Sequence, residues 1–130
     1  MYALDTNSLS YFLKGRGRVA ARLLSTPPAE VGLPSVVLYE LTYGAARSQA
    51  PRSLRERLDA LVGALQVFPF GAAEARTAAR VRLELEKAGQ PAGPHDLMIA
   101  ATALEQGAVL VTHDAREFRR IRGLRIEDWY

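Results

Sequence analysis

Short apolar runs alternate with longer segments of helical periodicity along the whole 130-residue chain. Each run has the length of a buried strand, and each segment between runs spaces its apolar residues as one face of a helix does. This alternation favours a parallel sheet that is covered by helices on both faces. We therefore predict an α/β fold with a central, mostly parallel sheet of about five strands. The length is that of one domain, so residues 1–130 are expected to share a single core.

The boundaries of the elements follow from apolar spacing and from turn residues. Strands are expected over residues 1–4, 30–34, 66–70, 108–112 and 124–127. Helices are expected over residues 8–13, 19–24, from 36 onward, 51–65, 72–88, 97–106 and 115–121. Asn7 or Ser8 is expected to cap the first of these helices, and Ser35 to cap the third, because both residue types are common N-caps.

Composition excludes several classes of protein. The chain has no cysteine, which rules out disulfides, thiolate zinc sites and cysteine nucleophiles. No apolar run approaches the ~20 residues that cross a bilayer, and Met1 leads directly into a predicted strand without a basic signal region. We therefore expect a cytoplasmic protein without a membrane partner.

The formal net charge is +3, and nearly all of the cations are arginines. Arginine forms bidentate contacts with phosphate, so a basic surface around an acidic site would suit a polyanionic substrate. Charge alone is equally consistent with an ordinary solvated surface.

Acidic residues stand at the predicted ends of strands and starts of helices. Asp5 and Asp114 follow predicted strands, and Glu40 and Asp96 lie near the N-termini of predicted helices. In a parallel sheet these positions meet at one edge, where ligands bind, so the four carboxylates are expected to converge on one cleft. The plain alternative is that Asp5 and Asp96 are helix caps. For Asp96 the two roles are compatible, since the helix dipole would lower its pKa and keep it ionised.

Four converging carboxylates need a counter-ion. Two of them about 4 Å apart repel by about 4 kcal/mol at an effective dielectric near 20, and all-oxygen ligation is what Mg²⁺ or Mn²⁺ prefers. The chemistry that this suggests is metal-assisted hydrolysis of a phosphodiester, in which one or two ions activate water and no protein nucleophile is required.

Four short motifs follow one another along the chain. They are Leu4-Asp5-Thr6-Asn7 with Phe12, Ser35 to Leu41 with its Glu40-Leu41 pair, Asp96-Leu97-Met98-Ile99-Ala100-Ala101, and Val111-Thr112-His113-Asp114 with Glu117-Phe118. In this order and at these spacings they resemble the motifs of the PIN-domain family, and specifically those of the VapC-type toxins of VapBC type II toxin–antitoxin pairs. The resemblance covers essentially the whole chain.

The resemblance implies an endoribonuclease that depends on Mg²⁺ or Mn²⁺. Its acids would be Asp5, Glu40, Asp96 and Asp114, with Asn7 and Thr112 supporting the metals or the attacking water. The segment Thr112-His113-Asp114 departs from many relatives of the family, which have asparagines there, and the fourth acid is the most variable of the set. The resemblance also implies a homodimer, inhibition by a cognate VapB-type antitoxin, and promoter DNA binding through the antitoxin.

Other interpretations stay open at this point. A haloacid-dehalogenase-like phosphatase also begins with a strand that ends in aspartate, but it needs a second aspartate where this chain has Asn7. A PIN-like module without catalytic activity would act only through its partner. His95 and His113 are candidates for metal ligands or general bases, although polar residues are expected at such loop-to-helix junctions.

Overall fold

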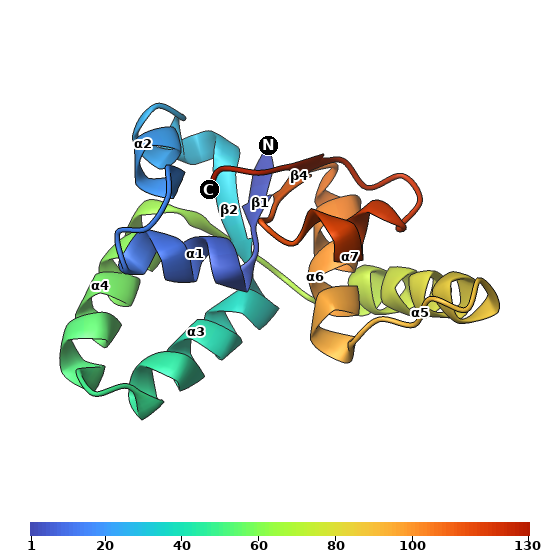
Figure 1. Ribbon diagram of the computed structural model, residues 1–130, viewed down its shortest axis with the longest axis horizontal. Coiled ribbons are helices and arrows are strands. Elements are labelled where there is room, and N and C mark those ends of the chain that lie inside the picture. Colours follow the sequence, from blue (N-terminus) through green and yellow to red (C-terminus); the bar gives the residue numbers. More distant parts are fainter.

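The computed structural model describes residues 1–130 and contains one five-stranded sheet (Figure 1). Every pairing in the sheet is parallel, and the strand order is β3-β2-β1-β4-β5. The strands are β1 (Tyr2–Leu4), β2 (Val31–Pro34), β3 (Gln66–Phe68), β4 (Val109–Val111) and β5 (Ile126–Glu127). All five predicted strands are therefore present, and the predicted α/β fold is confirmed.

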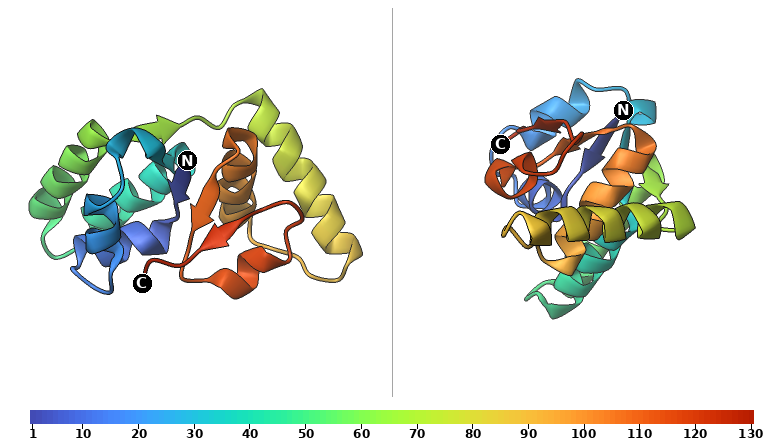
Figure 2. Two further views of the ribbon diagram at one scale, coloured as in Figure 1. Left: turned by 90° about the horizontal axis from the view of Figure 1, so that it is seen from above. Right: turned by 90° about the vertical axis from the view of Figure 1, so that its right-hand side faces the viewer.

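Helices cover both sides of the sheet. They are α1 (Thr6–Leu13), α2 (Val19–Leu24), α3 (Ser35–Arg47), α4 (Pro51–Ala64), α5 (Ala72–Lys87), α6 (Pro94–Gln106) and α7 (Ala115–Arg119), with a short 3₁₀ turn at Pro28–Glu30. The helices α1 to α4 lie on one side of the sheet, and α5 and α6 lie on the other (Figure 2). None of the seven helices combines the length and the apolar character that crossing a membrane requires.

The core is built on the two central strands. Leu4 of β1 and Leu110 of β4 are completely buried, and so is Leu33 of the neighbouring β2. Such burial on both faces explains why these strands appear in the sequence as continuous apolar runs rather than as alternating patterns. Near the C-terminus, Trp129 is also buried, and its ring lies 5.1 Å from that of Tyr2.

The structure corrects the predicted helix starts. The N-cap of α1 is Asp5, rather than Asn7 or Ser8, because β1 ends at Leu4 and the Asp5 carboxylate accepts a hydrogen bond from the backbone N–H of Ser8. Ser35 is the first residue of α3 and Pro34 is its N-cap, so the helix begins without a side-chain cap.

Several other boundaries also differ from the prediction, by one to three residues. Helix α6 begins at Pro94 rather than at residue 97, because proline suits the first helical position, where its missing N–H costs nothing. His95 and Asp96 therefore lie in its first turn. Helix α7 ends at Arg119, and β3 ends at Phe68 before Pro69.

Gly32 allows the aromatic ring of Phe68 to pack against β2. A Cβ atom added at Gly32 would lie 2.4 Å from the Phe68 ring, and Phe68 itself is 2% exposed. We predict that Gly32→Ala lowers the free energy of unfolding by about 1–3 kcal/mol, because the overpacked core must shift. Denaturant unfolding followed by circular dichroism measures this change.

Gly63→Ala is the matched control. Gly63 lies in α4 with open space where a Cβ atom would go, so alanine is expected to raise the free energy of unfolding by up to about 1 kcal/mol through helix propensity. Equal stability changes in the two variants would contradict the packing argument.

Candidate active site

The four predicted acids line one pocket of about 210 Å³ at the carboxyl ends of β1 and β4. The structure brings these acids to one place: Asp5 and Asp114 follow β1 and β4, and Glu40 and Asp96 belong to α3 and α6. The lining residues are Asp5, Glu40, Asp96 and Asp114, together with Thr6, Asn7, Ile99 and Phe118.

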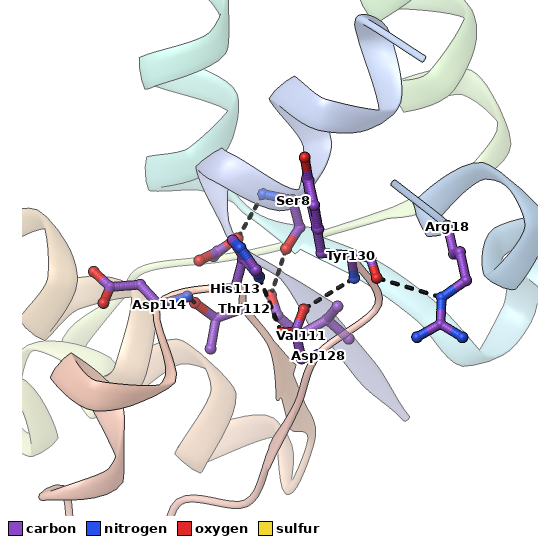
Figure 3. A network of polar contacts seen from close by, with 9 residues as sticks. Ser8, Arg18, Val111, Thr112, His113, Asp114, Asp128 and Tyr130 are labelled. Carbon is purple, nitrogen blue, oxygen red and sulfur yellow. Dashed lines mark hydrogen bonds and ion pairs between the residues drawn. The ribbon is translucent and has the colours of Figure 1, made fainter. Parts of the chain in front are cut away.

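The Asp5 carboxylate is held by the backbone at the start of α1. Asp5 is 4% exposed, and its Oδ1 accepts a 2.8 Å hydrogen bond from the Ser8 backbone N–H. The Ser8 hydroxyl in turn donates to the Val111 carbonyl of β4 at 3.2 Å, a contact that Figure 3 shows beside Thr112. Burial raises the pKa of Asp5 and the negative charge of Asp114 adds to this, while hydrogen bonds from Thr112 and Ser8 oppose it. The Asp5 side chain thus both caps α1 and lines the acidic pocket.

Glu40 is fixed by one partner at each carboxylate oxygen. Thr6 Oγ1 donates to Oε1 at 2.6 Å, and His95 Nδ1 lies 3.2 Å from Oε2. These contacts join α3 to α1 and to α6. Thr6 is not among the predicted site residues, although it stands within the Asp5-Thr6-Asn7 motif. His95 is predicted only as a candidate metal ligand or base, and its contact with Glu40 is a different role.

Asp96 lies in the first turn of α6, where its charge has little compensation. Burial raises its pKa, and the charges of Asp114, Glu40, Asp5 and Glu117 raise it further. The expectation that the helix dipole lowers this pKa is wrong, because desolvation and neighbouring carboxylates outweigh the dipole. The suggested capping role is also wrong, because the N-cap of α6 is Gly93.

Three further predicted residues occupy different surroundings. Asn7 is exposed and lines the acidic pocket. Thr112 is completely buried outside the pocket lining, and its Oγ1 accepts a 2.9 Å hydrogen bond from the Asp114 backbone N–H, so it shapes the turn that carries Asp114. His113 lies outside the acidic pocket, with its Nδ1 2.9 Å from Asp128 Oδ2.

The donor set fits a hydrated divalent cation. No three acidic or histidine side chains, in the conformations that they adopt, are arranged to hold a metal ion directly. Mg²⁺, however, is commonly bound through one or two carboxylates and several retained waters. The pocket offers carboxylate oxygens. Burial first, and neighbouring carboxylates second, raise the pKa values of Asp5 and Asp96, and a bound cation would stabilise their ionised forms.

Comparison with known proteins assigns this geometry to a family. The family model for the PIN domain matches residues 2–124. The chain belongs to the PIN-domain family. This assignment excludes the phosphatase that the sequence alone had left open.

The PIN-domain relatives that match along nearly their whole length are VapC proteins. The chain is 36% identical to the tRNA(fMet)-specific endonuclease VapC of Shigella flexneri over 98% of this chain and 97% of that protein. It is 35% identical to Ribonuclease VapC2 of Rickettsia felis, with 99% and 98% covered. These relatives place it in the VapC group of the family.

Crystal structures of VapBC complexes have the same fold. The structure of DNA-bound VapBC from Salmonella typhimurium superposes with a TM-score of 0.92 at 35% identity, covering 99% of this chain and 98% of that one. VapBC2 from Rickettsia felis, bound to a DNA fragment from its promoter, gives a TM-score of 0.92 at 32% identity, with 99% and 98% covered.

The raised pKa of Asp96 predicts how stability changes with pH. A carboxyl whose pKa is higher in the folded chain destabilises the fold once the pH exceeds its unfolded value, since ionisation costs more in the folded state. Without divalent cations, Asp96→Asn should therefore be more stable than the wild type at neutral pH. The difference in unfolding free energy between the two proteins should shrink as the pH falls toward 3.8, the ordinary pKa of an aspartate side chain. Urea unfolding in EDTA across this pH range measures it.

Asp59→Asn serves as the control for this prediction. Asp59 is exposed on α4, outside the acidic pocket, and loses the same formal charge on substitution. A lower stability of Asp96→Asn than of the wild type at neutral pH would contradict the prediction.

Proposed function

We propose that this protein is an endoribonuclease that depends on Mg²⁺ or Mn²⁺, and that it is the toxin of a VapBC-type pair. The observation that carries the proposal is the single pocket lined by Asp5, Glu40, Asp96 and Asp114. The names of the relatives support it, since these are a tRNA(fMet)-specific endonuclease and ribonucleases. RNA is accordingly the proposed substrate.

In the proposed reaction, water adds across a phosphodiester bond: its oxygen bonds to phosphorus, the P–O bond to the leaving ribose breaks, and that oxygen gains a proton. When bound, the divalent ion supplies charge neutralisation at the phosphate and activation of water. Asp5 and Asp96 would hold the ion, with Asp114 as a further ligand. The chain needs no nucleophile of its own, which agrees with the absence of cysteine.

The remaining polar residues in and beside the pocket position other side chains, water or the substrate and take no part in the bond changes. Both oxygens of Glu40 are engaged, by Thr6 and by His95, so its carboxylate is held at a fixed orientation toward the pocket. The exposed Asn7 amide can donate to a phosphate oxygen or to water. Thr112 acts through the backbone of Asp114.

The proposed partners are a cognate VapB-type antitoxin that inhibits the toxin, and a second copy of this chain in a homodimer. Solved complexes of similar VapC proteins with their antitoxins support the first. A groove of about 330 Å³ shares Thr6, Asn7 and Glu40 with the acidic pocket and extends to Lys14. An antitoxin segment in this groove would reach the acids. Any contact with promoter DNA is proposed to occur through the antitoxin.

Asp5→Asn tests the nuclease while leaving the fold intact. Asparagine is as good an N-cap as aspartate, so the hydrogen bond from Ser8 can persist. We predict that cleavage of total cellular RNA by the antitoxin-free protein falls at least about a hundredfold. Substituting a residue that only contacts a metal ligand typically costs about 10–100-fold in metal affinity or activity, so loss of a ligand itself should cost at least as much. The wild type should cut with Mg²⁺ or Mn²⁺ and stop with EDTA, and mapped RNA ends would identify the target.

Asp59→Asn should retain full cleavage in the same assay. Cleavage by Asp5→Asn at the wild-type rate would contradict the site assignment. A folded wild-type protein that binds the metal and cuts no RNA would favour a binding module without catalytic activity.

Metal binding can be tested separately from cleavage. A ligand that binds only the folded state raises the melting temperature in proportion to the logarithm of its concentration above Kd. We predict that Mn²⁺ raises the melting temperature of the wild type and of Asp59→Asn, and that the rise is lost in Asp96→Asn. Differential scanning calorimetry measures these shifts, and an equal rise in all three proteins would exclude Asp96 as a ligand.

A further inference from the structure

A second pocket adjoins the acidic pocket and has aromatic walls. Its volume is about 250 Å³, and its lining consists of Asn7, Tyr11, His113 and Asp114. Asn7 and Asp114 also line the acidic pocket, so the two pockets share a border. A ligand that is bound by one part in the acidic pocket would therefore place its adjoining part against Tyr11 and His113.

Three rings are packed together at this second pocket. His113 stacks on Tyr130 with ring centroids 4.3 Å apart and an interplanar angle of 24°. Tyr11 meets both rings edge-on, at 5.8 Å from His113 and 4.8 Å from Tyr130. The His113 side chain remains 43% exposed and Tyr130 remains 42% exposed, so the cluster presents aromatic surface to solvent.

Asp128 links two members of this cluster, His113 and Tyr130 (Figure 3). Asp128 Oδ1 accepts a 2.9 Å hydrogen bond from the Tyr130 backbone N–H, and Oδ2 lies 2.9 Å from His113 Nδ1. The ionised carboxylate can only accept, so His113 Nδ1 carries a proton and Nε2 is left for other partners. Arg18 donates to the Tyr130 carbonyl, and the Tyr130 ring packs against Gly17, where a Cβ atom would lie 2.9 Å away.

We propose that Tyr11, His113 and Tyr130 form a stacking subsite for an unstacked nucleobase next to the phosphodiester that is cleaved. This inference rests on the proposed nuclease function. Proteins that read single-stranded RNA stack its bases on tyrosine, phenylalanine, tryptophan or histidine rings. A nucleotide whose phosphate lies among the acids carries its base within reach of the bordering pocket, and the exposed Arg18 adds positive charge beside Tyr130.

Paired substitutions separate stacking from mere packing. Tyr11→Leu and His113→Leu remove a ring, whereas Tyr11→Phe and His113→Phe keep one. Base stacking is worth about 1–3 kcal/mol per base, which corresponds to about a 5- to 150-fold rise in Kd. We expect that rise for both leucine variants and less than about a twofold change for both phenylalanine variants. Tyr43→Leu, which removes an exposed tyrosine of α3 outside both pockets, should bind as the wild type does.

The probe is a fluorescein-labelled single-stranded RNA oligonucleotide of mixed sequence, and its binding to the antitoxin-free protein is followed by fluorescence anisotropy in EDTA. Circular dichroism melting confirms that each variant is folded. A second oligonucleotide carries 2-aminopurine, whose fluorescence is quenched on stacking. Quenching by the wild type and by Tyr11→Phe, but not by Tyr11→Leu, supports the subsite directly.

The outcomes distinguish this inference from the nuclease proposal. Folded leucine variants that bind the RNA as tightly as the wild type, while the wild type still cuts RNA with Mn²⁺, overturn the subsite alone. Leucine variants that lose affinity for the antitoxin but not for RNA also overturn it and assign the cluster to the protein partner. A wild type that neither binds nor cuts RNA overturns both.

Discussion

The hydrogen bond from the Ser8 backbone N–H to the Asp5 carboxylate is the contact on which the rest of the site depends. It caps α1, and the same residues tie that helix to the central sheet. The Asp5 N–H and the Ser8 hydroxyl both donate to the Val111 carbonyl at the end of β4. The buried carboxylate is therefore positioned by the backbone of two adjacent strands and one helix, so the site cannot move independently of the core.

The strand order explains why the other acids reach Asp5. The chain leaves β1 toward β2 on one side and later returns to β4 on the other, so the order reverses between β1 and β4. A crevice forms where the order of a parallel sheet reverses. Asp5 and Asp114 follow the two strands that border this crevice. Glu40 and Asp96 enter it from α3 and α6, which lie on opposite sides of the sheet (Figure 2).

The sheet, and the position of acids at its carboxyl edge, could be predicted from the sequence because both depend on local patterns. Buried parallel strands are continuous apolar runs, and an acid directly after such a run lies at the ligand-binding edge. The N-cap of α1 was not predictable in the same way, because Asp5, Asn7 and Ser8 are all good N-cap residues. Which of them caps the helix depends on where β1 stops pairing with β4. The contacts of Glu40 with Thr6 and His95 span 34 and 55 residues, and no spacing rule indicates them.

The acids differ in how their charge is compensated within the chain. Asp5 accepts a hydrogen bond from the Ser8 backbone N–H, and Glu40 has a partner at each oxygen. For Asp96, burial and neighbouring carboxylates raise the pKa, and no hydrogen bond offsets them. Its ionised form therefore costs folding free energy, which a positive charge beside it would reduce. The proposed cation would offset part of this cost, so the stability of the cation-free chain and the stabilisation by the cation would be linked through the same carboxylate.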